Sequence, residues 1–472
     1  MIGRKKEINE LEELYNSGKC ELVTIYGRRR VGKTFLVDEV FSDKITFRHA
    51  GLSPADKENS DLKNQLTNFY YSLITQGMKG IKVPKSWMEA LYLLQKFLMD
   101  KDDGTRQLVW IDELPWLDGR KSGFLTAFEA FWNNFACHRK NLMVIVCGSA
   151  NSWILNKLIH NHGGLYGRVT YQIKLEPFTL KECEDFLLEK GIKESRYDIC
   201  SAYMSVGGIP YYLGYFKRGK SVAQNINDIF FRKNAPLKNE YNDLFSSIFT
   251  SPEQIKEIVK ALSKRNIGYT KEEITKELNM KDGGTLTDQL NALIASDFIV
   301  KYRPFGKKQK YRYKLVDPFC KFYLHFVNEK EINETYYLDS NTSPSVVTWR
   351  GFAFENVCFN HIWQIKNALS INGILTEESS WSKSDDERGS QIDLLIERKD
   401  NVVNMCEIKY CNKDFTVDKG YFKILLQRQD ILQQELPKKC SVQNVLITTM
   451  GLKYNEYSSI FQNVITLDDL FK

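Results

Sequence analysis

Hydrophobic positions in the first part of the chain gather in short runs that are separated by stretches with helical periodicity. Short apolar runs bounded by turn residues are typical of strands that are buried on both faces. Four such runs lie at 21–27, 107–113, 141–149 and 170–178. Because helical segments separate the runs, the pattern predicts an α/β fold with a parallel sheet over residues 1–178.

Beyond the fourth run the pattern changes three times. Thr179 can cap a helix, and we expect a small helical lid subdomain over 179–250. Residues 251–316 predict three helices and then two strands around a turn with proline and glycine, which is the order of a winged-helix domain. Residues 317–472 predict helices, a β-rich stretch, a long helix and a last strand, and therefore a second α/β domain.

Two capping boxes support the helices of the winged-helix segment. Thr270 stands three residues before Glu273, and Thr285 stands three residues before Asp288. A side chain of this kind accepts a backbone hydrogen bond at the start of a helix. We therefore expect helices to begin directly after Thr270 and Thr285.

Composition places the chain among globular proteins. Of the 472 residues, 43% are hydrophobic and 26% are charged, which excludes a disordered or disulfide-stapled chain. The longest apolar run, 142–147, is too short to span a membrane, and the first ten residues are too charged for a signal peptide. Ten cysteines form no CxxC pair, so we expect free thiols in the cytoplasm, no structural zinc and no membrane association.

Positive charge is concentrated in the winged-helix segment. The net charge is +7, and residues 253–315 hold 14 Lys and Arg against 8 Asp and Glu. A basic, aromatic-rich hairpin can lie along a DNA backbone, while the preceding helix has no arginine to read bases. Interdomain packing is the alternative use of such a wing. The hairpin's basic residues are Lys301, Arg303, Lys307, Lys308, Lys310, Arg312 and Lys314.

The turn after the first predicted strand fits the P-loop pattern GxxxxGK[ST]. Its glycines let backbone N–H groups surround phosphates, Lys33 would reach the β- and γ-phosphates of ATP, and Thr34 would hold Mg²⁺. We expect the nucleotide to contact the loop and the start of the following helix. These residues are Gly27, Arg28, Arg29, Arg30, Val31, Gly32, Lys33, Thr34 and Phe35.

Polar residues follow the second and third predicted strands. Asp112 suits the position of a magnesium ligand, and Glu113 that of the general base that activates water. The third strand ends near Ser149 and Asn151, either of which could orient the γ-phosphate; a simple turn is the alternative.

A second group of acidic and basic residues lies near the C-terminus. Glu407 and Lys409 project from one face of a predicted strand, and a turn at 398–401 could bring Asp393 beside them. Two carboxylates bind Mg²⁺ through oxygen, and a lysine can position or activate water against a phosphodiester. Alternating charge on an ordinary exposed strand is the competing interpretation.

The N-terminal motifs together resemble the archaeal-type ATPases related to the AAA proteins, near the STAND branch of P-loop NTPases. The resemblance implies that Ile2, Gly3 and Arg4 line the adenine pocket and that Pro210 closes over the nucleotide. It makes Arg168 a candidate arginine finger, with a salt bridge as the alternative. It rests on 2–4, Glu7, 27–34, 110–113, 148–153, 164–168 and 207–210.

The resemblance is incomplete in one respect. We find no convincing second-sensor arginine in the lid segment. The need for a partner subunit, including a homo-oligomer, therefore stays open.

The C-terminal pattern is similar to the PD-(D/E)xK restriction-endonuclease-like fold, here as Asp393 with Glu407-Ile408-Lys409. Glu355 would match the upstream acidic residue of that fold. The sequence thus predicts an ATP- and Mg²⁺-dependent protein that binds DNA and carries a nuclease-like domain. The alternatives are a nucleotide-dependent switch whose C-terminal domain does not cleave, and a chaperone-like or transport-associated ATPase.

Overall fold

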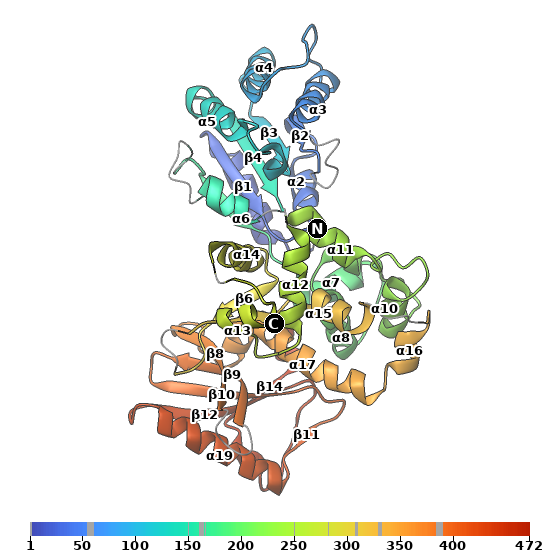
Figure 1. The fold of residues 1–472 in the computed structure, drawn as a ribbon, viewed down its shortest axis with the longest axis vertical. Coiled ribbons are helices and arrows are strands. Elements are labelled where there is room, and N and C mark those ends of the chain that lie inside the picture. The colour runs from blue at the N-terminus through green and yellow to red at the C-terminus, as the bar shows by residue number, and fades with distance from the viewer. Residues whose placement is uncertain are drawn as a thin grey trace. The chain divides into compact units, whose positions relative to one another are not determined.

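The computed structural model describes residues 2–53, 61–149, 151–159, 165, 167–249, 251–281, 283–306, 310–328, 333–383 and 390–472. The chain divides into two units, shown in Figure 1. The N-terminal unit comprises 1–177 and 242–252, and the C-terminal unit comprises 178–241 and 253–472.

Five parallel strands form the sheet of the N-terminal unit, in the order β2-β3-β4-β1-β5. The four predicted strands are confirmed, whereas β2 was not predicted. It lies at the edge of the sheet, so several of its side chains reach solvent and its sequence lacks a continuous apolar run. The strands are β1 (Glu21–Tyr26), β2 (Ile45–Ala50), β3 (Gln107–Asp112), β4 (Leu142–Gly148) and β5 (Tyr171–Lys174).

Helices cover both faces of this sheet, because successive side chains of each strand point to opposite sides. Val23 and Ile25 pack with α1 (Lys5–Tyr15) and α2 (Lys33–Phe41), while Leu22 belongs to the core on the other face. That second core is built mainly by three helices. They are α3 (Leu62–Thr75), α4 (Trp87–Asp100) and α5 (Phe124–Asn134).

The C-terminal unit starts with a group of helices, as predicted for 179–250. Thr179 caps the first of them in a reciprocal box with Glu182, and Gly191 after its end has a φ of 72°. The helices are α7 (Leu180–Glu189), α8 (Arg196–Val206), α9 (Pro210–Leu213) and α10 (Val222–Phe230); α15 (Pro318–Phe322) packs against α8. Helix α11 (Glu240–Ile248) runs across the boundary between the units.

Residues 252–315 have the predicted order of three helices and a two-stranded sheet. The capping box at Thr270 is confirmed, but the one at Thr285 is wrong. The helix begins two residues earlier than predicted, after Gly283, so Thr285 lies inside its first turn and cannot cap it. The elements are α12 (Pro252–Ser263), α13 (Lys271–Glu277), α14 (Gly284–Ala295), β6 (Ile299–Tyr302) and β7 (Arg312–Leu315).

A mixed sheet with the order β14-β12-β10-β9-β8 forms the C-terminal part. Strands β8, β9 and β10 are antiparallel, and β12 and β14 run parallel to β10. The strands are β8 (Thr376–Lys383), β9 (Ser390–Arg398), β10 (Val402–Lys409), β12 (Ser441–Thr448) and β14 (Asn463–Thr466), with a short pair β11 (Phe415–Thr416) and β13 (Leu452–Lys453). The helices are α16 (Tyr336–Ser340), α17 (Pro344–Asn360), α18 (Ile362–Ala368) and α19 (Lys419–Glu435).

Phe305 of the wing is buried in the same apolar cluster as Trp381, Leu395 and Leu432 of this sheet and α19. The hairpin therefore packs against the C-terminal sheet. Across the described residues, no helix is both long and apolar enough to cross a membrane. All ten cysteines are free thiols, as the composition predicts.

Candidate functional site

The loop between β1 and α2 is shaped by two glycines. Gly27 has a φ of 151°, and a Cβ atom there would lie 2.2 Å from the carbonyl oxygen of Leu175. Gly32, at the N-cap of α2, has a φ of 99°. A side chain at either position would strain the backbone, so the loop keeps its shape only with glycine there.

Lys33 points back into the loop that precedes it. Its Nζ atom donates to the carbonyl oxygens of Gly27 at 2.9 Å and Arg28 at 3.0 Å. Burial lowers the pKa of Lys33, although the carboxylates of Glu113 and Asp112 act in the opposite direction. The ammonium group is thus held at the centre of the loop, where a P-loop places phosphate oxygens.

Thr34 and Asp112 come together as the sequence predicts. Thr34 Oγ1 donates to Asp112 Oδ2 at 2.8 Å, and Asp112 Oδ1 accepts the backbone N–H of Glu113 at 2.9 Å. Burial and the neighbouring Glu113 raise the pKa of Asp112. A hydroxyl and a carboxylate at this spacing are the oxygen ligands that Mg²⁺ prefers, so these two residues fit a magnesium ion.

Glu113 is positioned by the end of β4. Its carboxylate accepts the backbone N–H of Ser149 at 3.0 Å and also contacts the Ser149 hydroxyl. A Cβ atom on Gly148 would lie 2.6 Å from Pro115, so glycine is needed to bring the strand end this close. Ser149 is therefore the partner of Glu113; the side chain of Asn151, the other candidate, lies outside the described residues.

Arg4 connects the N-terminal segment to the loop. Its Nη2 atom donates to the carbonyl oxygens of Glu176 at 2.7 Å and Val31 at 3.4 Å, and the side chain is 4% exposed. Gly3 before it has a φ of 67°. The segment predicted to line an adenine pocket is thus attached to the phosphate loop.

The other predicted residues of this site differ in exposure. Arg28 is buried, Arg29 and Arg30 are partly exposed, and Phe35 is 58% exposed. Arg168 is exposed, and its backbone N–H donates to Leu165. Accessible positions suit residues that contact a ligand or a partner, but exposure alone assigns neither role.

Pro210 starts α9 in the C-terminal unit, two residues after the glycine pair that ends at Gly208. A Cβ atom on Gly208 would lie 1.9 Å from the carbonyl oxygen of Phe178. Phe178 donates its backbone N–H to Gly208 at 2.6 Å. This part of the motif therefore has a structural reason that does not depend on nucleotide.

The three predicted C-terminal residues also meet. Strands β9 and β10 pair with Cys406 opposite Leu394, so the next step of the register sets Glu407 beside Asp393. Lys409 Nζ lies 2.6 Å from Glu407 Oε1. Sequence reasoning missed two further partners from α19: Arg428, which donates to Glu407 Oε2 at 2.9 Å, and Tyr421, which donates to Oε1.

Glu355, on α17, interacts electrostatically with Asp393 of this group and is also hydrogen-bonded to a polar pair. The amide of Asn266 donates to the Glu355 carboxylate, and Lys321 Nζ donates to Asn266 Oδ1 at 2.6 Å. Burial, together with Asp393, raises the pKa of Glu355 to about 7. Burial, together with Glu407, raises the pKa of Asp393 to about 6. Carboxyl groups with such pKa values exchange protons near neutral pH, as general acids and bases do.

Lys314 belongs to this group as well, and its assignment to a DNA-facing wing is wrong. The side chain is 2% exposed, and its Nζ atom lies 4.0 Å from the centre of the Phe359 ring. Burial lowers its pKa to about 8, opposed by Glu355 and Asp393. The wing strand turns this residue inward because the hairpin packs against the rest of the unit.

The remaining wing residues are divided between solvent and internal pairs. Lys301 and Lys310 are exposed. Arg303 lies 3.7 Å from Glu377, and Arg312 lies 3.4 Å from Glu273. Lys307 and Lys308 lie outside the described residues.

The donor chemistry of the C-terminal group only partly fits a metal ion. Carboxylates suit Mg²⁺, but both oxygens of Glu407 already contact the cations Lys409 and Arg428. Within the described ranges, no group of three or more Asp, Glu, His or Cys residues is arranged to hold a metal. A metal at Asp393 would therefore have to compete with these two cations for Glu407.

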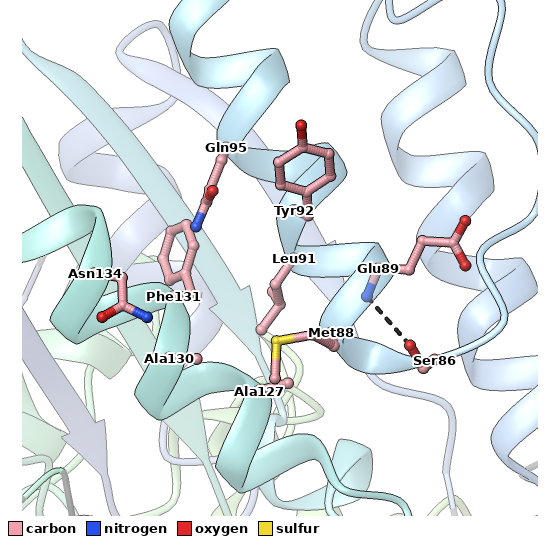
Figure 2. A pocket seen from close by; sticks show the side chains of 10 residues that line it. All are labelled: Ser86, Met88, Glu89, Leu91, Tyr92, Gln95, Ala127, Ala130, Phe131 and Asn134. Atoms are coloured by element: carbon pink, nitrogen blue, oxygen red, sulfur yellow. Dashed lines mark hydrogen bonds between the residues drawn. The ribbon is translucent and has the colours of Figure 1, made fainter.

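A separate cavity of about 450 Å³ lies between α4 and α5 of the N-terminal unit (Figure 2). Tyr92, Met88 and Phe131 provide much of its apolar wall. Glu89 is the charged residue of its lining, and no residue of the phosphate loop contributes. This cavity is therefore not part of the nucleotide site.

Comparison with known proteins supports the nucleotide site. Residues 1–216 match a family described as an ATPase domain predominantly from Archaea. An uncharacterized protein of Methanocaldococcus jannaschii is 27% identical over 89% of this chain and 90% of its own length. An uncharacterized ATP-binding protein of the same organism is 26% identical over 44% of this chain and 67% of its own length.

Two solved structures show weaker similarity. The Walker-type ATPase of Pyrococcus abyssi is 18% identical, with a TM-score of 0.46, over 69% of this chain and 96% of its own. The ORC2 protein of Aeropyrum pernix is 14% identical, with a TM-score of 0.42, over 69% of this chain and 94% of its own. The N-terminal part of the chain is thus similar to an ATPase domain found mainly in Archaea and to an ATP-binding relative, which supports ATP binding and hydrolysis.

Proposed function

We propose that the N-terminal unit binds ATP with Mg²⁺ and hydrolyses it, and that the C-terminal unit handles DNA in response. The observation that carries the first part is the bond between Thr34 and Asp112 beside Lys33. In this assignment Lys33 contacts the β- and γ-phosphates, and Thr34 and Asp112 hold the magnesium ion, which neutralises phosphate charge when bound. Glu113 takes a proton from the attacking water.

The carboxylate of Glu113 contacts Ser149 in this structure. This contact must break before Glu113 can face the attacking water. A Glu113 engaged by Ser149 is a poorer base than one that faces water. We therefore propose that hydrolysis requires a change at the end of β4, with Arg168 as the arginine that would contact the γ-phosphate. Pro210 and the lid helices would close on the nucleotide.

For the C-terminal unit we propose a winged helix on a PD-(D/E)xK-like domain that cleaves a phosphodiester with Mg²⁺. The convergence of Asp393, Glu407 and Lys409 supports this assignment, and Glu355 adds a further acidic group. Lysine beside two carboxylates can position water for attack on phosphorus.

A second candidate function has its own observation. Glu407 is already paired with Arg428 and Lys409, an arrangement that stabilises the domain without a metal. This favours a nucleotide-dependent switch in which the C-terminal domain binds but does not cleave.

Cleavage of plasmid and single-stranded DNA in Mg²⁺ or Mn²⁺, with and without ATP, separates the two candidates. We expect Asp393→Asn and Lys409→Ala to abolish cleavage and leave ATP turnover intact. Glu397→Gln, on the same strand as Asp393, is the matched control and should cleave normally. Absence of cleavage by the unaltered chain, with ATP turnover present, would reject the nuclease and favour the switch.

A further inference from the structure

A cavity of about 830 Å³ opens in the C-terminal unit, next to the carboxylate group, by which we mean the cluster of Glu355, Asp393 and Glu407. Its walls come from 263–267, from 321–325 and from the first half of α17. Asn266 and Lys321 both line it, and they are the residues whose hydrogen bonds lead to Glu355. The volume is in the range of pockets that hold a nucleotide-sized ligand.

The ionisable side chains that line this cavity are all basic. Lys264, Arg265, Lys321 and His325 contribute, and no carboxylate belongs to the lining. The first two have acidic partners outside the cavity, Glu277 at 2.6 Å and Glu273 at 3.6 Å.

Lys321 differs from those two residues, because it donates to the neutral amide of Asn266. Burial and the nearby Lys314 lower its pKa well below the ordinary value. An anion in the cavity would relieve this unfavourable environment, so the inner end of the cavity suits a phosphate.

An aromatic surface accompanies these cations. Phe352 lines the cavity and is 48% exposed, whereas its neighbour Trp349 is buried against Phe326 at 4.9 Å between ring centres. An exposed ring on a rigid helix, beside cations, is the usual platform on which an unpaired base stacks.

The cavity and the carboxylate group share one face of α17. Thr348 and Phe352 line the cavity, and Glu355 and Phe359 follow at helical spacing on the same side. Phe359 contacts Lys314, which interacts with Glu355 and Asp393. A nucleic-acid strand that enters the cavity could therefore continue toward the carboxylates.

We propose that this cavity binds one unpaired nucleotide of a single-stranded nucleic acid, with its base on Phe352 and its phosphate near Lys321. This names the substrate class of the C-terminal site, and its position next to a cleaved bond rests on the proposed nuclease function. A duplex cannot offer a base to Phe352 without unpairing it.

Equilibrium binding of a short fluorescein-labelled oligothymidylate tests this proposal. The full chain carries Lys33→Ala, so that the P-loop does not contribute, and EDTA prevents metal-dependent cleavage. We expect Phe352→Ala and Lys321→Met each to weaken binding by about 10-fold or more, the range for loss of one stacked base or one phosphate contact. Tyr92→Ala, which removes a similarly exposed ring (53%) from the N-terminal unit, is the matched control and should bind normally.

Wild-type affinity in Phe352→Ala would overturn the proposal, as would the lack of any oligothymidylate binding. Phe352→Tyr keeps a stacking ring and should restore affinity. The pair of variants at position 352 therefore tests the proposal even where Lys321→Met fails to fold. Thymidine monophosphate that displaces the probe as well as unlabelled oligothymidylate would overturn the assignment to a strand. Phe352-dependent binding without cleavage in Mg²⁺ would support this site while rejecting the nuclease.

Discussion

The two candidate sites of this protein are assembled in different ways. At the phosphate loop, Lys33 and Thr34 start the helix that follows β1, and Asp112 ends β3 of the same parallel sheet; a direct hydrogen bond joins Thr34 to Asp112, and Lys33 bonds to the loop itself. At the C-terminal site, Glu407 meets Lys409 from its own strand but also Arg428 from α19. The first site is local to one edge of a sheet, whereas the second depends on packing between distant segments.

The difference lies in how each buried charge is compensated. Lys33 donates hydrogen bonds to backbone carbonyl oxygens, and phosphate oxygens could take the place of these acceptors. Glu407 contacts two cations, and Glu355 lies near two lysines, the buried Lys314 and the half-buried Lys321. A ligand can therefore enter the first site by exchanging hydrogen bonds, while the second must separate ion pairs, which costs more.

The largest expected effect is at the phosphate loop. Lys33→Ala removes the charge that contacts the phosphates, so ATP affinity should be lost and turnover should fall by about 100–1,000-fold. Isothermal titration with ATP and a phosphate-release assay measure both quantities. Lys96→Ala, on the exposed side of α4, is the control. Wild-type ATP binding by Lys33→Ala would show that the loop does not bind phosphate through Lys33, so the two sites would no longer differ in how a ligand enters them.

The pH dependence of stability should expose the second site. The pKa of Glu355 is raised from 4.5 to about 7, so unfolding releases a proton between those pH values. Stability should therefore fall as pH rises from about 4.5 to 7, by about 3 kcal/mol for this group. Urea unfolding across this range measures the slope. Glu355→Gln should reduce this slope, to which the raised pKa of Asp393 also contributes, and an unchanged slope in that variant would contradict the assignment.

Breaking one ion pair of Glu407 should have a smaller effect. Arg428→Ala leaves the buried carboxylate with Lys409 and Tyr421, and we expect a loss of about 2 kcal/mol in the free energy of unfolding. Arg398→Ala removes a more exposed pair with Asp400 and should cost about 0.5 kcal/mol or less. Equal losses in the two variants would show that the Glu407 cluster is not specially stabilised.

The smallest expected effect concerns the wing. Lys301→Ala and Lys310→Ala remove exposed charges, so each should reduce the salt dependence of DNA binding by about one counterion. Lys314→Ala should leave the salt dependence unchanged, because that residue is buried. Affinities measured over a series of salt concentrations give the slopes. A slope that changes only in Lys314→Ala would reverse the assignment of the wing residues.

Sequence patterns predicted contiguous features better than packed ones. The loop at 27–34 and the other four strands of the N-terminal sheet follow from local patterns, as does the meeting of Asp393 with Glu407 across a short turn. Strand β2 was missed because polar residues interrupt its sequence, ITFRHA, which therefore has no continuous apolar run. Arg428 and Lys314 could not be assigned, because only tertiary packing turns them toward the carboxylates.

The central claim is that Glu113 acts as the base of an ATP-hydrolysing site. The direct test is single-turnover ATP hydrolysis by Glu113→Gln, with Glu129→Gln on α5 as the matched control. We expect a rate about 10²–10⁴-fold lower in Glu113→Gln, with ATP still bound, and a normal rate in the control. Hydrolysis at the wild-type rate by Glu113→Gln would contradict it.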